Sequence, residues 1–290
     1  MSNPSFSAAT DFILANARLL ERRIFAALYG DGDGASVAAV VSAYRNADGG
    51  LGHALEPDIR CAESQPLFVE EGLAALEAVG AGVEALAIGL CDYLSRVCDP
   101  RGLVAPIVGS ALTAPHAAHW TERALEPGLN PTAGICGLLH AQRVRHDWLE
   151  RATESCVAAV RAQPPAEAHS LRCVARLAEY HPDPTERSSL REIVAAALPG
   201  SSFYLADASA SEYGLTPLAF AVTADSPWRE LFTPDQLEAH LHALAAEQQD
   251  DGGWPIRWQP PSAAAVQEWR GYATLGAVRT LVSYGVLDSS

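Results

Sequence analysis

The 290-residue sequence lacks two features that would direct the chain to a membrane. No run of about eighteen apolar residues is present, which argues against a membrane-spanning helix. The N-terminal residues are polar and lack a basic region followed by an apolar stretch, which argues against a secretory signal. We therefore expect a soluble, cytoplasmic protein with no membrane span.

Basic residues are also scarce. Lys and Arg number 20 against 35 Asp and Glu, so the formal net charge is -15 at pH 7. Nucleic-acid binding needs a concentrated positive face that displaces counterions, and the scattered arginines form no such run. No nucleophile elbow, phosphate-binding glycine loop or dinucleotide fingerprint is present either. We expect a small-molecule substrate and no nucleic-acid partner.

The six cysteines are dispersed along the chain, and no two of them form a C-x-x-C pair. This distribution favours reduced thiols over a disulfide framework. Because a free cysteine packs as a small hydrophobe, we expect most of them in the core.

Apolar residues recur at helical spacing along most of the chain, and no segment alternates convincingly with a period of two residues. Prolines in first turns and glycines after last turns mark several segment boundaries. The segments are 11–28, 35–44, 66–79, 83–97, 131–143, 146–161, 166–180, 184–198, 233–247 and 266–284. The sequence therefore predicts an all-α fold.

A short motif occurs near each end of the chain. Residues 45–51 (RNADGGL) match residues 248–254 (QQDDGGW), and each copy follows an apolar helix and precedes, after a loop, another helix. Helix pairs must stack to bury their apolar faces, and the best-matched copies lie at opposite ends of the chain. We therefore predict a single domain over residues 1–290, an α/α toroid in which about five to six antiparallel helix hairpins close into a ring.

The second copy reads Gln249-x-x-Gly252-x-Trp254 and is followed by Trp258. This segment resembles the glutamine–tryptophan repeat of the terpene cyclase and protein prenyltransferase superfamily. The resemblance implies an α/α toroid in which the glutamine and aspartate tie backbone groups at a helix end, the glycines permit a tight turn and the tryptophan stacks on the next unit. The superfamily's catalytic motifs, a D-x-D-D sequence or a set of zinc ligands, have no match here. The resemblance therefore implies the fold and leaves the chemistry open.

Reactive side chains are densest in the loop after the first motif copy. His53, Glu56, Asp58 and Arg60 lie within residues 52–61, where a toroid places residues of its inner rim. Imidazole and carboxylate groups this close together can serve as acids and bases. Two other interpretations compete with this one. Either Glu56 or Asp58 pairs with Arg60 and holds the loop, or His53, Glu56 and Asp58 bind a divalent metal.

A second loop, residues 110–130, is long for a connection between helices, which is typical of a functional loop. His116 is predicted to be a further acid–base group in this loop. An alternative is that His116 and His119 form half of a metal site, which His53 or Glu56 completes.

Aromatic residues accompany the predicted loops. Trp120, Trp258 and Tyr213 are predicted to line a substrate pocket, whereas Trp254 and Trp269 are predicted to seal the seams between units. Arg60 is a candidate for binding a carboxylate or phosphate group of the substrate.

The leading hypothesis from the sequence is an enzyme that binds a small or hydrophobic substrate. Glu56, Asp58, His53 and His116 would carry out acid–base catalysis of a cyclisation, isomerisation or elimination, a reaction class suggested by the terpene cyclase resemblance. No cofactor is assigned, and a divalent metal is the alternative. A second hypothesis is a carbohydrate-active toroid, either a glycosidase, an epimerase or a lyase, with two opposed carboxylates. A third is a non-catalytic module that binds a peptide or a protein.

Overall fold

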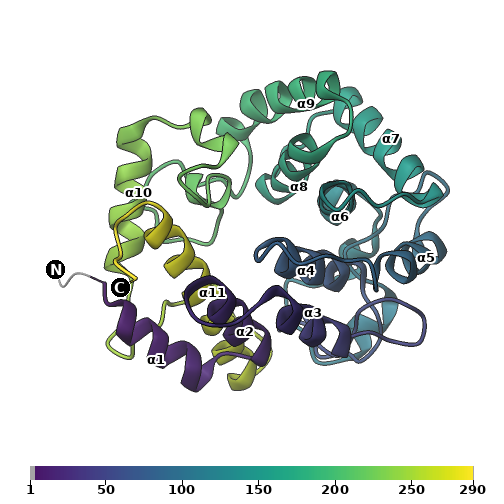
Figure 1. Cartoon of the computed structure of the whole chain (residues 1–290). Helices are drawn as coiled ribbons and strands as arrows, with labels where there is room; N and C mark the ends of the chain where they lie inside the picture. The colour runs from purple at the N-terminus through teal and green to yellow at the C-terminus, as the bar shows by residue number, and fades with distance from the viewer. Residues whose placement is uncertain (1–3, 290) are drawn as a thin grey trace. The chain divides into compact units, whose positions relative to one another are not determined.

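The computed structural model describes residues 4–289, which fall into two compact units. Unit 1 comprises Met1–Gly32 and Phe203–Ser290, and unit 2 comprises Asp33–Ser202. The described residues form eleven α-helices and, apart from isolated bridges, no β-strand, so the predicted all-α fold is confirmed (Figure 1). No helix in this range is long and apolar enough to span a bilayer. The single-domain toroid stays a prediction.

Unit 2 contains seven helices, six of which alternate between two rows. Helices α4, α6 and α8 pack on one another in turn to form the first row, and α5, α7 and α9 form the second (Figure 1). Helix α3 packs on α4. The bounds are α3 Gly34–Ala43, α4 Pro66–Glu77, α5 Ala87–Val97, α6 Leu129–Ala141, α7 Asp147–Ala162, α8 Ala168–Tyr180 and α9 Pro184–Ala197.

The three helices of the first row run parallel to one another. Near their N-terminal ends, the Cys173 thiol of α8 lies 3.6 Å from the Glu70 carboxylate of α4 and 3.7 Å from the Asn130 side-chain oxygen of α6. At their C-terminal ends, the His140 ring of α6 lies 6.1 Å from the ring of His181, which follows α8. The loops that lead into the three helices therefore arrive at the same end of the row.

Helix α6 forms the centre of unit 2. Every residue from 131 to 139 is buried, so this helix is enclosed on all sides and does not present one apolar stripe. Gly137 allows the close approach of α8, because a Cβ atom at this position would lie 2.5 Å from the backbone carbonyl oxygen of Arg176.

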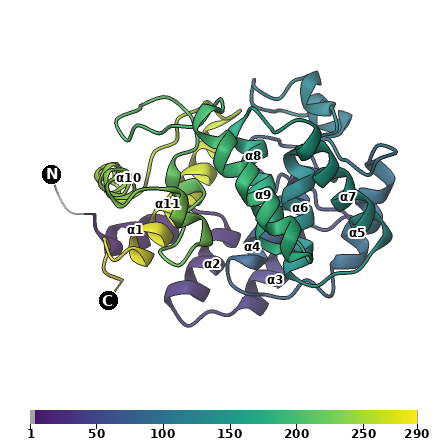
Figure 2. The same ribbon diagram turned by 90° about the horizontal axis from the view of Figure 1, so that it is seen from above.

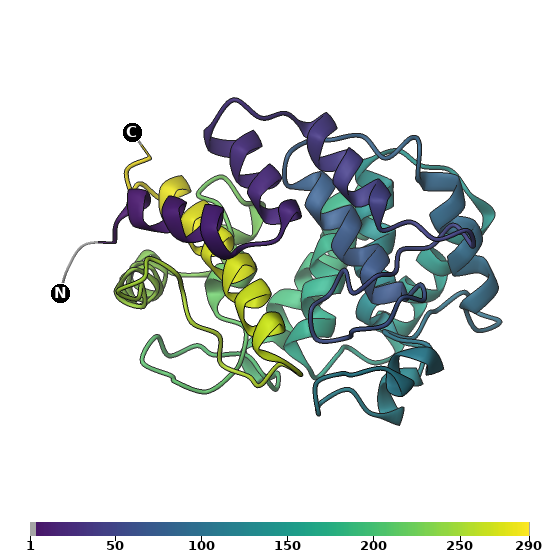
Figure 3. The same ribbon diagram turned by 90° about the horizontal axis from the view of Figure 1, so that it is seen from below.

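Unit 1 contains both ends of the described chain, and its helix α11 packs against α1, α2 and α10 (Figure 3). The bounds are α1 Phe6–Asn16, α2 Leu19–Tyr29, α10 Pro234–Ala246 and α11 Ala263–Ser283. The structure differs from the sequence analysis at residues 11–28, which form parts of two helices. The chain is extended at Ala17 and Arg18 (ψ 157° and 164°). This break places Ala17 against Gly271, where a Cβ atom would lie 2.6 Å from that of Ala17.

The two motif copies fold into the same turn, one in each unit. In both, the residue two positions before the aspartate donates its backbone N–H to the carbonyl oxygen of the second glycine, at 2.9 Å. The aspartate accepts the N–H of that glycine, at 3.0 Å in the first copy and 3.1 Å in the second. The first glycine has a left-handed backbone, with φ 86° at Gly49 and 85° at Gly252, which glycine adopts most readily. The repeat seen in the sequence is therefore present in the backbone.

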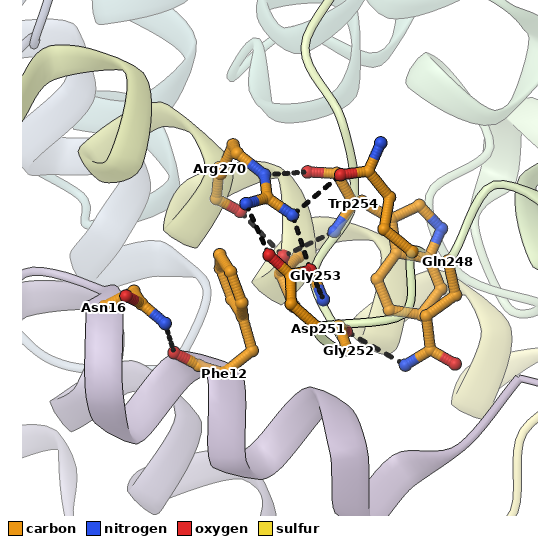
Figure 4. Close-up of polar contacts among 10 residues, drawn as sticks. Phe12, Asn16, Gln248, Asp251, Gly252, Gly253, Trp254 and Arg270 are labelled. Carbon is orange, nitrogen blue, oxygen red and sulfur yellow. Dashed lines mark hydrogen bonds and ion pairs between the residues drawn. The ribbon is translucent and has the colours of Figure 1, made fainter. Parts of the chain in front are cut away.

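One helix covers each turn, and the two helices use the same spacing. In α5, Gly89 and Tyr93 lie against the two glycines of the first turn. In α1, Ala8 lies against Gly252 and Phe12 lies against Gly253. Figure 4 shows Phe12 beside this turn. Helix α1 thus holds the position in unit 1 that α5 holds in unit 2, and the N-terminal helix completes the repeat that α10 and α11 begin.

Polar side chains fix the second turn (Figure 4). The Arg270 guanidinium donates two hydrogen bonds to the Asp251 carboxylate, both at 2.7 Å, and a third to the Gln249 side-chain oxygen at 2.9 Å. The hydrogen bond from Arg270 is the main reason that the pKa of Asp251 lies below its usual value. Gln248 binds the backbone of Ser5 at the start of α1. The side chain that ties the backbone is therefore Gln248, one position before the glutamine that the resemblance singled out.

Candidate active site

Two loops pack edge to edge at the N-terminal end of the α4, α6 and α8 row. Arg60 donates its backbone N–H to the Pro115 carbonyl oxygen, and Ala117 donates to the carbonyl oxygen of Asp58, both at 2.9 Å. An isolated antiparallel bridge at Ile59 lies between these bonds. The loop after the first motif copy and the long loop before α6 therefore form one structure.

Both carboxylates of the first loop are buried. Glu56 is 5% exposed and Asp58 is 2% exposed, among the buried side chains of Leu55 and Ile59. The Glu56 Oε2 atom accepts the backbone N–H of Asp58 at 3.0 Å. A buried carboxylate needs polar partners to remain charged. The N–H of Asp58 is such a partner for Glu56, and this bond fixes the backbone of the loop at Asp58.

The Asp58 carboxylate faces the imidazole of His119. Its Oδ2 atom lies 3.6 Å from the His119 Nε2 atom, and the His119 side chain is 51% exposed. This separation is longer than a hydrogen bond, but contacts between catalytic groups often shorten only when a substrate binds. A buried carboxylate thus lies next to an imidazole that is accessible to solvent and ligands.

Burial lowers the pKa of His119 below its usual value, and the Asp58 carboxylate opposes this effect. The nearby imidazoles of His169 and His116 lower the pKa further. The ring is therefore neutral at pH 7 and able to accept a proton. Asp58 favours the Nε2–H tautomer, which leaves Nδ1 as the basic atom.

A second carboxylate–histidine pair lies at the start of α8. Glu167 caps this helix, because its carboxylate accepts the backbone N–H groups of His169 and Ser170 at 3.0 and 3.2 Å. The same carboxylate also contacts the Nδ1 atom of His169, whose side chain is 23% exposed. Burial raises the pKa of Glu167, but the contact with the His169 ring and the hydrogen bonds from the backbone N–H groups of His169 and Ser170 together outweigh burial and leave the pKa below its usual value.

The structure places three of the predicted loop residues, Asp58, His116 and Trp120, near His119. His116 is close enough to lower the pKa of His119, and its Nδ1 atom lies 2.7 Å from the Ala114 carbonyl oxygen. The Trp120 ring lies 5.1 Å from the His119 ring, at 48° to it. His53 is not part of this group. It has a left-handed backbone (φ 58°) and an exposed side chain that makes no hydrogen bond or ion pair within residues 4–289.

The other two predicted substrate-binding residues, Tyr213 and Trp258, lie in unit 1. Their rings are 5.5 Å apart and nearly perpendicular. Trp258 also contacts Trp269 at 5.0 Å, and Trp269 contacts Tyr272 at 5.3 Å. Tyr213 and Tyr272 are each 40% exposed, so this chain of rings presents aromatic surface to solvent.

One polar cluster in unit 2 was not predicted from the sequence. Glu70 of α4 is 4% exposed, accepts a hydrogen bond from the Cys173 thiol and lies 3.8 Å from the Arg176 Nη1 atom. Burial and the Glu70 carboxylate raise the pKa of the Cys173 thiol. The sequence did contain a signal for this cluster. A glutamate in a helix that is apolar on all sides is buried and needs a polar partner inside the protein.

The sequence left a metal site open as an alternative and favoured reduced cysteines. Across residues 4–289, no group of three or more His, Cys, Asp and Glu side chains is placed to hold a metal ion. The six cysteines are free thiols, and all except Cys98 are buried, as expected for core residues.

Comparison with models of known protein families gives no match for this chain, and comparison with curated proteins gives none either. The case for a function therefore depends on the geometry of the two carboxylate–histidine pairs.

Proposed function

We propose that the protein is an acid–base enzyme whose reaction takes place at His119, with Asp58 as its orienting carboxylate. The substrate class is a small molecule that undergoes isomerisation, cyclisation or elimination through proton transfer. The observation that carries the proposal is the burial of Asp58, at 2% exposure, directly behind a half-exposed imidazole.

This arrangement suits a general base. A neutral imidazole accepts a proton from the substrate at Nδ1, and the buried carboxylate stabilises the imidazolium that forms. Asp58 does not itself take the proton, so its contribution is to orient the ring and to stabilise the imidazolium. The Asp58 backbone N–H donates to the Glu56 carboxylate, and the Asp58 carbonyl oxygen accepts the N–H of Ala117, so both bonds fix the backbone of Asp58 while the charge changes.

The arrangement is less suited to a glycosidase. That chemistry needs two carboxyl groups on opposite sides of a sugar. Glu56 and Asp58 lie two residues apart in one loop, and one of them hydrogen bonds to the backbone of the other. The burial of both also argues against a purely recognitive loop, which has no need of buried carboxylates.

A relationship to the terpene cyclase and prenyltransferase superfamily is part of the proposal. Its support is the pair of matched turns, each closed by the same backbone bonds and covered by a helix at the same spacing. This support concerns the fold, and the proposed acid–base site has no counterpart in the superfamily's catalytic motifs.

Hydrogen exchange with solvent tests the function directly. We would incubate the enzyme in D2O with a panel of isoprenoid alcohols, aldoses, 2-oxo acids and 3-oxo acids, and measure deuterium incorporation by mass spectrometry. We expect at least one class to gain deuterium, and the His119→Gln variant to lose this activity by about 100-fold or more.

The matched control is His242→Gln, which replaces an exposed histidine on α10 that pairs only with Glu238. This variant should exchange deuterium at the rate of the wild type. The proposal fails if no compound exchanges, or if His119→Gln exchanges as fast as the control.

A further inference from the structure

The turn that carries His119 also carries an aromatic ring. Trp120 donates its backbone N–H to the carbonyl oxygen of Ala117 at 3.0 Å, and Ala117 in turn donates to the carbonyl oxygen of Asp58 at 2.9 Å. Both side chains contact the His119 ring. The centroid of the nearest Trp120 ring lies 5.1 Å from its centroid, and the Asp58 Oδ2 atom lies 3.6 Å from its Nε2 atom. Two backbone bonds thus connect the two groups that contact this imidazole.

The Trp120 side chain is not held in place by a hydrogen bond of its own. Its indole N–H is buried and has no acceptor among residues 4–289. A buried donor without a partner costs free energy, and folded proteins leave few such groups. The side chain as a whole is only half-buried, so it does not fill the core of unit 2. The position of the ring is therefore set by packing, in which His119 is its aromatic partner.

The separation of the two rings falls in the range of a cation–π contact. A cation within about 6 Å of the centroid of an aromatic ring is attracted to that ring, and indole is the most effective of the aromatic side chains. The centroids of His119 and Trp120 are 5.1 Å apart, and the ring planes are inclined at 48°. Protonated His119 therefore gains an attraction to Trp120 that the neutral imidazole largely lacks.

We propose that Trp120 is a positioning residue of the proposed active site, which stabilises the imidazolium that forms when His119 takes a proton from the substrate. This inference rests on the proposed acid–base function and adds no step to the reaction. Asp58 and Trp120 have complementary roles. The carboxylate orients the ring and attracts its charge, and the indole attracts the same charge while covering part of the ring.

The other groups that act on His119 are known, so the contribution of Trp120 can be isolated. Burial lowers the pKa of His119, the Asp58 carboxylate raises it, and His169 and His116 lower it. All three titratable groups remain when Trp120 is replaced by leucine, and leucine keeps an apolar side chain beside the imidazole. Trp120→Leu thus removes the π system and retains much of the burial.

The first test is an NMR titration of His119 in histidine-labelled protein without a substrate. In Trp120→Leu the pKa of His119 should fall by roughly half a unit, because the imidazolium loses its aromatic partner. Trp120→Phe keeps a ring and should show a smaller fall. A pKa of His119 that stays the same or rises in Trp120→Leu overturns the inference. If circular dichroism shows that Trp120→Leu does not fold, the same criterion applies to Trp120→Phe.

The matched control for this titration is Trp258→Leu. The indole N–H of Trp258 is also buried and without an acceptor in the described part of the chain, but its ring contacts are with Tyr213 and Trp269. The pKa of His119 should therefore be the same in this variant as in the wild type. An equal fall in Trp258→Leu and Trp120→Leu would mean that the shift does not come from the contact with His119, and the inference would be wrong.

The second test separates this inference from the proposed function. For a compound that the wild type exchanges in D2O, Trp120→Leu should lower kcat about 2–3-fold at high pH and move the rise of the rate to lower pH, because its base is weaker. A wild-type pH profile in Trp120→Leu, beside an inactive His119→Gln, leaves the proposed function standing and overturns the role of Trp120. If His119→Gln exchanges as fast as the wild type, both are wrong.

Discussion

At the scale of single residues, buried carboxylates of this protein lie beside positively charged side chains. Glu21, at 1% exposure, binds the Arg18 guanidinium, and Glu70 lies beside Arg176. Such pairs offset the cost of removing a charge from water. Asp58 differs because its partner His119 is half exposed and is an imidazole, which gains and loses a proton far more readily than a guanidinium. The charge opposite Asp58 can therefore appear and disappear during a reaction, which a permanent arginine does not allow.

A half-buried histidine of α6, His140, gives a prediction about pH and stability. Burial, aided by the neighbouring His181, lowers the pKa of His140 to about 4. Its Nε2 atom lies 2.9 Å from the Thr153 hydroxyl. The folded protein thus favours the neutral ring, whereas the unfolded chain binds a proton below about pH 6.5. Stability that His140 contributes above pH 6.5 should be lost as the pH falls from 6.5 toward 4.

The free energy of unfolding in urea, measured between pH 7 and pH 4.5, tests this prediction. The decline should be shallower in His140→Gln than in the wild type, because the substituted residue does not titrate. His242→Gln, which changes an exposed ring, should follow the wild-type curve. Parallel curves for the wild type and His140→Gln would show that His140 does not govern this range.

At the scale of single elements, glycines set how closely neighbouring helices and turns approach. Gly137→Ala should lower the free energy of unfolding by about 1–3 kcal/mol, because the added Cβ atom meets the backbone of α8, which cannot rotate away. Gly276→Ala on α11 is the matched control, since no atom lies within 4 Å of its Cβ position. There, alanine should stabilise the helix by about 0.5–1 kcal/mol. Similar effects at the two sites in urea unfolding would contradict this account of α6 and α8.

The turns allow a second comparison between glycines. Gly252 and Gly285 both have left-handed backbones, with φ 85° and 71°. An added Cβ atom at Gly252 overlaps the Ala8 carbonyl oxygen, whereas the space at Gly285 is open. Alanine at Gly285 should cost about 1 kcal/mol of backbone strain, and alanine at Gly252 should cost clearly more. Equal losses of stability would mean that α1 does not pack on the turn as described.

At the scale of the whole molecule, unit 1 is made from the two ends of the sequence. Helix α1 covers the second turn, and the C-terminal end of the described chain lies near the start of α1 in each view (Figures 1, 2 and 3). The first helix is therefore equivalent to a helix that would follow α11 if the repeat continued. This relation gives a reason for the matched motifs near the chain ends.

Moving α1 tests this relation. Deletion of residues 1–17 should lower the thermal unfolding temperature, because it uncovers the second turn and leaves the Arg270 guanidinium without the Phe12 ring, 4.5 Å away. Attaching residues 4–17 after residue 289 through a flexible Gly/Ser linker should restore most of the lost stability. A relocated helix that restores nothing would show that α1 is not the continuation of α11.

The sequence was sufficient for features that depend on local chemistry. Helical periodicity gave the all-α fold, and the Asp-Gly-Gly motifs gave two equivalent turns because only glycine adopts their backbone readily. It was insufficient at residues 11–28, where the packing of Ala17 on Gly271 breaks the helical pattern in two. That contact joins distant segments and leaves no periodic signal.

The candidate site could be predicted only in part for the same reason. The loop around Glu56 and Asp58 was identified from its composition, but which histidine faces Asp58 depends on the register between two loops some sixty residues apart along the chain. His53 is close in sequence and points elsewhere, whereas His119 is distant and faces the carboxylate. The contact between Glu167 and His169 was not predicted, because in the sequence it looks like an ordinary helix cap.

The pairing of Asp58 with His119 is the central claim, and the pKa of His119 in Asp58→Asn tests it most directly. The carboxylate raises the pKa of His119 against the effect of burial, so its loss should lower this pKa in an NMR titration. Asp92→Asn, which removes a carboxylate paired with His146, should leave the pKa of His119 as it is in the wild type. A pKa of His119 that stays the same or rises in Asp58→Asn would contradict the account.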